Sequence, residues 1–232
     1  MNPQTAPRLD FRLRRTAAVS GLGASVAFVV GAGWLQLAGV EAIDAPGTGI
    51  RDSAADHRAS LLACYAFWNA GIVVQLVFLV ALSLWLYRLG HVLLAAVGAL
   101  ASAVLTSVMV VGYVFLGALA FRAADLSAEQ ARLLNDLFYL FLSIAGFPGA
   151  TVAVALSLPM VRGCGLLGAI GWLGIASAAV HIETALALAT SGPWSPAGWG
   201  GYVAPALFLA WMFFFSTLAL RGDPFAAPRS GS

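Results

Sequence analysis

The chain contains no lysine: all 12 of its basic residues are arginine, and only 9% of its 232 residues are charged. Without a lysine amine it forms no Schiff base with retinal or pyridoxal phosphate, and it has no Walker-type phosphate-binding lysine. The low charge also argues against a soluble domain, in which about a quarter of the residues are charged. These absences exclude several enzyme and photoreceptor classes and point to a membrane protein.

Cysteine and histidine are also scarce, with 2 and 3 residues respectively. Cys64 and Cys164 are predicted at opposite membrane faces, and a disulfide requires Cα atoms within about 7 Å, so we expect two free thiols. Only one histidine lies deep in an apolar span, and no Cys or His cluster has the spacing of a metal site. We therefore expect no haem, no metal and no other cofactor.

Apolar residues dominate what is present, at 61% of the chain. Six apolar stretches of about 20 residues or more can each cross a hydrocarbon core of about 30 Å as a helix. Because no alternating ten-residue barrel strands occur, we predict an all-α, multi-pass bundle over residues 17–221, with tails at 1–16 and 222–232. The predicted spans are 17–40, 61–87, 91–121, 133–160, 165–190 and 201–220.

The arginines predict the orientation of this bundle. Eight fall on the side of the two chain ends and four on the other side, where most acidic residues also lie. The positive-inside rule therefore places both termini in the cytoplasm. The pair Arg14-Arg15 is better explained by a signal anchor than by an export signal, because the following apolar run is long. Lysine-free usage rich in Ala, Gly and Arg is typical of a GC-rich bacterium, so we expect the bacterial cytoplasmic (inner) membrane.

Several local features refine the predicted bundle. The second and third spans are expected to form a hairpin with a tight turn at Leu89-Gly90. The longest outer loop is 41–60, and the loop 122–132 contains a helix start at 126–129. Pro148 is expected to kink the fourth span, because a proline frees a backbone carbonyl. Glycines at every third position from Gly165 to Gly174 predict a fifth span that is closely surrounded by neighbours. An interfacial aromatic belt is predicted from Trp34, Trp68, Trp172, Trp194, Trp199, Tyr202 and Tyr87.

The fifth span carries two ionisable residues, His181 and Glu183. A carboxylate inside the membrane costs several kcal/mol unless it is paired or solvated, so Glu183 indicates a functional site. The two residues point about 200° apart on a helix and do not chelate one ligand. His181 shares a small, partly polar face and is predicted to point into the bundle. Glu183 needs a partner from another helix, and Asn69 is expected at the same depth.

These residues support two hypotheses. The first is a polar, outward-facing pocket that binds a ligand, with Asn135 and Asp136 near its mouth. The second is that the same side chains bond to one another and fix helix packing, at about 0.6–2 kcal/mol per contact. The predicted ligand-binding residues are His181, Glu183, Asn69, Tyr65 and Tyr113.

Three functions follow from these hypotheses. The protein binds, senses or transports a small molecule, with Glu183 as the ligand-pairing group and His181 as a donor or proton partner. Alternatively, it is an accessory subunit that packs in a larger membrane assembly, or against a second copy, without a site of its own. The third is an intramembrane enzyme acting on lipid, which requires a titratable pair and a lateral opening near the kink of the fourth span. Ser177, one turn before His181, is a weak candidate for a catalytic nucleophile in general. The expected partners are the lipid bilayer and a small-molecule or membrane-protein partner. The net charge is only +2 and the basic residues are split between two faces, so we expect no nucleic acid as a partner.

The inner turn and the start of the fifth span carry a pattern, Val161-Arg162-Gly163-Cys164-Gly165-Leu166-Leu167-Gly168 followed by Gly171-Trp172-Leu173-Gly174. The last helix ends in Leu-Arg-Gly at 220–222. With the Arg-bearing start and the acidic outer loop, the chain resembles the uncharacterised six-helix membrane proteins of bacteria that are grouped as a domain of unknown function. The resemblance covers the architecture of nearly the whole chain and implies no activity.

Overall fold

The computed structural model describes residues 6–38, 45–187, 195–196 and 199–225. In these ranges six helical segments are long and apolar enough to cross a membrane, which confirms the all-α, multi-pass prediction. They are α1 (Ala6–Ala38), α3 (Arg58–Arg88), α4 (Val92–Arg122), α5 with α6 (Ala128–Ile144 and Gly146–Val161), α7 (Leu166–Ala185) and α8 (Trp199–Arg221).

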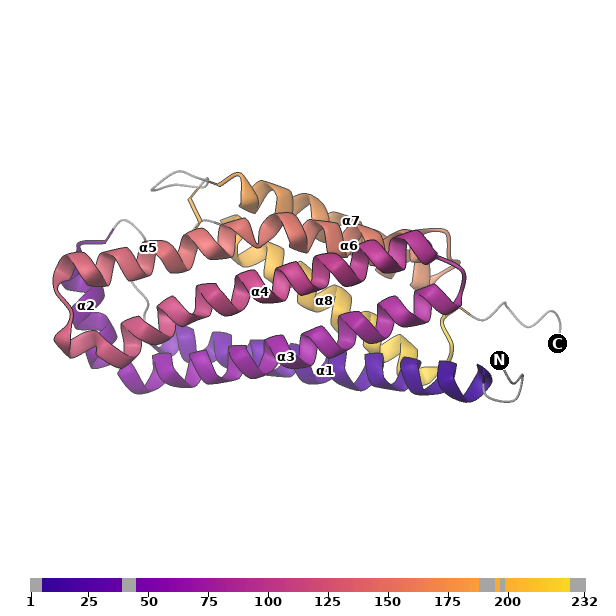
Figure 1. Cartoon of the computed structure of the whole chain (residues 1–232), viewed down its shortest axis with the longest axis horizontal. Helices are drawn as coiled ribbons and strands as arrows, with labels where there is room; N and C mark the ends of the chain where they lie inside the picture. Colours follow the sequence, from indigo (N-terminus) through magenta and orange to yellow (C-terminus); the bar gives the residue numbers. More distant parts are fainter. Residues whose placement is uncertain (1–5, 39–44, 188–194, 197–198, 226–232) are drawn as a thin grey trace.

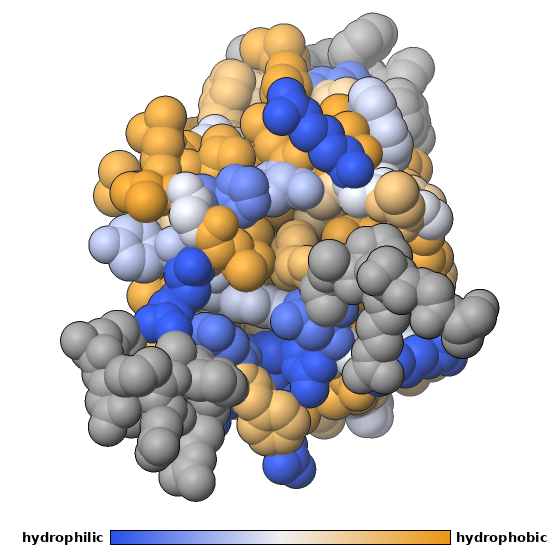
Figure 2. All heavy atoms as spheres, turned by 90° about the vertical axis from the view of Figure 1, so that its right-hand side faces the viewer, coloured by the Kyte–Doolittle hydropathy of each residue, from blue (hydrophilic) through white to orange (hydrophobic). Residues whose placement is uncertain are grey.

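The helices run roughly along one axis, with the start of α1 and the end of α8 at the same end of the bundle (Figure 1). We call this the terminal end and the opposite one the distal end. Cys64 and Cys164 are both free, as predicted. The terminal end carries many hydrophilic side chains among apolar ones (Figure 2).

The first helix begins at Ala6, well before the predicted start at residue 17. The arginines of the expected tail are therefore helical, and arginine is a good helix former. Near this start, Asp10 accepts a hydrogen bond from Arg88 Nε at 2.9 Å and so ties α1 to the end of α3. These roughly three turns of helix were not predicted, because polar residues before an apolar run resemble a tail.

The predicted outer loop 41–60 contains a short helix, α2 (Gly47–Asp56), and α3 begins directly after it at Arg58. Only Ile50 and Ala54 of α2 are buried, and they lie one turn apart. Gly47 lies so close to the Ala128 carbonyl oxygen at the start of α5 that a Cβ atom would overlap it. The segment 39–44 lies outside the described residues.

Two local predictions are confirmed, namely a turn between two helices and a helix start. The hairpin between α3 and α4 closes at Gly90, whose φ of 92° favours glycine. The predicted helix start near Ser127 is a capping box, in which Ser127 Oγ accepts from the Gln130 amide and the Gln130 side chain accepts from the Ser127 amide. These local signals depend on a few adjacent residues, which is why the sequence reveals them.

The fourth span is interrupted at Ala145, three residues before Pro148. The backbone of Ala145 stays helical, at φ −59° and ψ −19°, and α6 continues in the direction of α5 (Figure 1). Pro148 occupies the first turn of α6, where the backbone amide hydrogens have no partner within the helix, so the missing one breaks no hydrogen bond of α6. The structure therefore has an interruption of the helix near the predicted kink.

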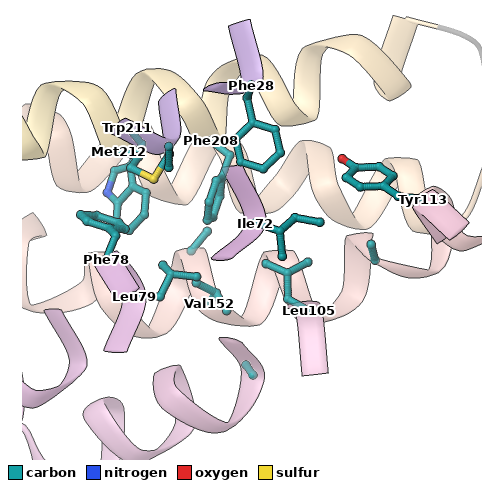
Figure 3. Packing of buried hydrophobic residues seen from close by; sticks show 14 of the residues in the cluster. Phe28, Ile72, Phe78, Leu79, Leu105, Tyr113, Val152, Phe208, Trp211 and Met212 are labelled. Carbon is teal, nitrogen blue, oxygen red and sulfur yellow. The ribbon is translucent and has the colours of Figure 1, made fainter. Parts of the chain in front are cut away.

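The best-buried span is α3, of which 56% is inside the bundle, against 39% for α7. Around α3 pack side chains from α1, α4, α6 and α8, including Phe28, Leu105, Val152 and Trp211 (Figure 3). The prediction that the glycine-rich α7 is central is wrong. Its glycines do allow close approach, since a Cβ at Gly171 would lie 2.6 Å from the Val161 amide nitrogen, but this approach is to α6.

Candidate functional site

The structure divides the predicted site residues into two groups. Tyr65 and Asn69 lie on α3 and Tyr113 lies on α4, and we call these the α3–α4 group. His181 and Glu183 lie on α7 and form the α7 group. No hydrogen bond between the two groups occurs in the described residues.

Each member of the α3–α4 group has a local packing contact. Asn69 Nδ2 donates to the Tyr65 carbonyl oxygen at 2.8 Å, within its own helix. The Tyr65 ring lies against Gly117 of α4, where a Cβ atom would be 2.8 Å from the ring. Tyr113 is only 3% exposed, and its ring centroid is 4.9 Å from that of Trp68. This geometry is typical of side chains that join helices.

Trp68 of α3 packs beside the α3–α4 group, although it was predicted to belong to the interfacial aromatic belt. Its Nε1 donates to the Phe28 carbonyl oxygen at 3.2 Å, and its ring lies where a Cβ of Gly31 would be. It also stacks on Phe138 of α5, with centroids 6.5 Å apart. The belt prediction is therefore wrong for Trp68, which joins α1, α3, α4 and α5.

Other predicted belt residues do reach the bundle surface. Trp34, Trp172, Tyr87 and Tyr202 are exposed, as interfacial aromatic side chains should be. The side chains of Trp194 and Trp199 lie outside the described residues.

His181 points between α6 and α8, which confirms the predicted inward direction. A Cβ at Gly149 of α6 would lie 2.6 Å from its ring, and the Phe208 ring of α8 is 5.6 Å away, centroid to centroid. Nδ1 lies 2.8 Å from the Ser177 carbonyl oxygen. A carbonyl only accepts, so Nδ1 carries the hydrogen and is not a base toward the Ser177 hydroxyl, 3.3 Å away.

Glu183 differs from every other acidic residue of the described ranges. Both of its carboxyl oxygens are buried and have no hydrogen-bond partner among the residues that the structure describes. The partner expected from the sequence, Asn69, bonds to Tyr65 instead. A carboxylate removed from water without a partner is costly, so this position requires a cation or a hydrogen-bond donor.

The two groups lie at different depths, contrary to the sequence expectation. Tyr113 contacts Phe138 of α5, at 6.3 Å between centroids, whereas His181 contacts Gly149 of α6. Phe138 and Gly149 are eleven residues apart on one span, about 16 Å along a helix. Counting inward from the helix ends failed because the 31-residue α3 and the 20-residue α7 do not end in one plane.

Other residues also have buried polar atoms without a described partner, which the sequence did not predict. Ser157 Oγ of α6 and Trp211 Nε1 of α8 are buried without a hydrogen-bond partner in the described residues, and both lie beside Gly174 of α7. Near the distal end, Asn135 is 1% exposed, and its amide atoms likewise lack described partners. It borders a cavity of about 10 Å³ beneath Ser53 of α2. The neighbouring Asp136 lies 4.0 Å from Arg132.

Comparison with known proteins adds no activity to this geometry. No family model, curated protein or solved structure matches the chain. None of these comparisons supports the resemblance to a bacterial six-helix family that the sequence suggested. The structure supports a multi-pass membrane protein in contact with the lipid bilayer, with its family unidentified. Within the described ranges, no three His, Cys, Asp or Glu side chains gather as a metal site would require.

Proposed function

We propose that this protein binds a small molecule that carries a positive charge or a hydrogen-bond donor, and that Glu183 is its polar contact. The observation that carries the proposal is the burial of both Glu183 carboxyl oxygens without a partner in the described residues. Ionisable residues inside membrane spans commonly mark substrate or ion pathways. Binding at this carboxylate would serve either sensing or transport.

In this proposal His181 positions Glu183. Its imidazole bonds to Ser177 within α7, and it packs on Gly149 of α6 and Phe208 of α8. These contacts fix the rotation and depth of the last turns of α7. Glu183, two residues farther along, is held in the direction that this rotation allows.

The described arginines support a cytoplasmic terminal end, and with it a ligand that reaches Glu183 from outside. Seven of them lie toward the terminal end, at 8, 12, 14, 15, 88, 162 and 221, and four toward the distal end, at 51, 58, 122 and 132. The positive-inside rule then favours both chain ends in the cytoplasm. We assign the protein to a bacterial inner membrane on its lysine-free composition.

The direct test is a thermal-shift screen of the purified protein in mild detergent. The probes are sodium, potassium, ethylammonium, guanidinium and choline, each as the chloride and at constant ionic strength. At least one probe is expected to raise the melting temperature of the wild type but not of Glu183→Gln. Glu129→Gln is the matched control, because Glu129 is exposed at the start of α5. Equal responses of wild type and Glu183→Gln, or no response at all, would count against the proposal.

One observation favours the accessory-subunit alternative. The most exposed span is α4, with only 28% inside the bundle. Its exposed side chains at 93, 97, 100, 104, 107, 111 and 114 follow the 4–3 spacing of a helix-pairing seam. Cross-linking of a Ser107→Cys variant in membranes tests this candidate, with the exposed Val73→Cys on α3 as control. A disulfide-linked dimer formed only through position 107 would support it.

A further inference from the structure

A long groove lies between α1 and α3 on the lipid-facing surface of the bundle. Its volume is about 1070 Å³, larger than most small-molecule sites, and it is open along its length. Its walls are apolar side chains and a glycine, namely Phe11, Val19, Gly23, Val73, Val74 and Val77. A Cβ atom on Gly23 would lie 3.4 Å from Val74 Cγ1, so a larger side chain at this position would narrow the groove.

Charged side chains line one end of the groove only, at Arg12 and Arg15. The hydroxyl residues Thr16 and Ser20 follow, and Ser20 Oγ donates to the Thr16 carbonyl oxygen at 2.6 Å, within its own helix. Both arginines are exposed, and neither has an ion pair among the described residues. Arg14, by contrast, lies over the Phe11 ring at 5.4 Å, and Arg88 is paired with Asp10. The groove therefore combines an apolar channel with two uncompensated positive charges at its mouth.

The length of the groove matches half of a bilayer. From Arg12 to Gly23 the helix advances eleven residues, about 16 Å, and half of a hydrocarbon core is about 15 Å. Its apolar end is lined by Val73, which is the middle residue of α3. The charged mouth is thus at the membrane surface of the terminal end, and the apolar part reaches the bilayer midplane.

We propose that this groove binds one anionic phospholipid from the leaflet at the terminal end. The phosphate group would lie between Arg12 and Arg15, since guanidinium groups pair well with phosphate oxygens. One acyl chain would follow the valines toward Gly23. Anionic lipids are attracted to basic side chains at the membrane surface, whereas a zwitterionic lipid gains little from them. The proposal is independent of Glu183, which lies on α7 and does not line the groove.

Native mass spectrometry of the purified full chain measures this binding. Phosphatidylglycerol and phosphatidylcholine with identical acyl chains are titrated, and lipid-bound protein is counted at each concentration. The wild type should bind phosphatidylglycerol on the order of tenfold more tightly than phosphatidylcholine. Arg12→Gln with Arg15→Gln should abolish this preference, and Arg12→Lys with Arg15→Lys should keep most of it. Arg162→Gln with Arg221→Gln removes two exposed charges at the same end outside the groove and should leave it unchanged.

A second variant tests the apolar channel without altering charge. Gly23→Leu places a side chain in the groove and should weaken the binding of both lipids severalfold. Gly33→Leu, on the same helix with nothing near its Cβ direction, is its control. Equal affinity of the wild type for the two lipids would overturn the proposal. So would equal losses in the two double glutamine variants, or unchanged lipid binding by a folded Gly23→Leu protein.

Discussion

The α3–α4 group consists of a tyrosine, an asparagine and a second tyrosine, whereas the α7 group consists of a histidine and a glutamate, and the two groups differ in whether their polar atoms have hydrogen-bond partners. Asn69 has its partner within one helical turn, and Trp68 bonds to the neighbouring α1. Glu183 has buried oxygens with no described partner. Buried polar groups in proteins are normally satisfied, so an exception calls for an explanation outside ordinary packing. Asn135, Ser157 and Trp211 share this lack of a described partner, but Glu183 is the one of these side chains that can carry a charge. The comparison therefore supports the proposal that the α3–α4 group joins helices and that Glu183 is a ligand contact.

The largest expected effect tests the structural side of this comparison. Trp68→Ala removes a hydrogen bond and a side chain that joins four helices, so we expect the free energy of unfolding to fall by about 3 kcal/mol or more. Trp172→Ala is the control, because Trp172 is 61% exposed. Unfolding in mixed detergent micelles measures both variants. Equal stability of the two would show that Trp68 does not organise the distal half.

A middle-sized effect tests the positioning of α7. Gly149→Ala would bring a Cβ atom within 2.6 Å of the His181 ring, so the ring or the helix must shift. We expect a loss of about 1–3 kcal/mol in unfolding free energy. Gly33→Ala has nothing within 4 Å of its new carbon and should cause no loss. Suppression of the Gly149→Ala defect by His181→Ala would identify this contact as the cause.

The smallest effect contrasts the two groups directly. Asn69→Ala should lower the free energy of unfolding by about 0.6–1 kcal/mol, because it removes one satisfied intramembrane hydrogen bond. Glu183→Gln should cause no loss, because Glu183 makes no described hydrogen bond that the change could break. Both are compared with wild type by thermal unfolding in the same detergent. A larger loss in Glu183→Gln than in Asn69→Ala would make Glu183 a packing residue.

Much of the fold could be predicted because membrane spans leave a strong signal in composition. The six spans, the hairpin at Gly90 and the capping box at Ser127 each depend on residues that are near one another in sequence. The helix α2 was missed because Ile50 and Ala54 are its only buried residues among polar ones. Helix boundaries in polar segments carry a weaker signal than a long apolar run.

The site was harder to predict, for a physical reason. A transmembrane helix is apolar on every side, so its pattern shows weakly which face meets neighbours and which meets lipid. The inward direction of His181 could be inferred because glycine, serine and alanine share its face. The inward position of Trp68 could not, because a tryptophan near a span end suits an interface equally well. The positions of Ser157 and Trp211, whose buried polar atoms have no partner among the described residues, could not be predicted because three helices meet at Gly174.

Labelling of Glu183 with a hydrophobic carbodiimide, which reacts with carboxyl groups inside membranes, tests the central claim most directly. Peptide mass spectrometry follows the modification of Glu183 over time, with and without the cation that stabilises the wild type most strongly in the thermal-shift screen. The account predicts that Glu183 is modified and that a saturating concentration of this cation slows the reaction severalfold, while labelling of Glu129 is unchanged. A labelling rate at Glu183 that does not depend on the cation would contradict the account.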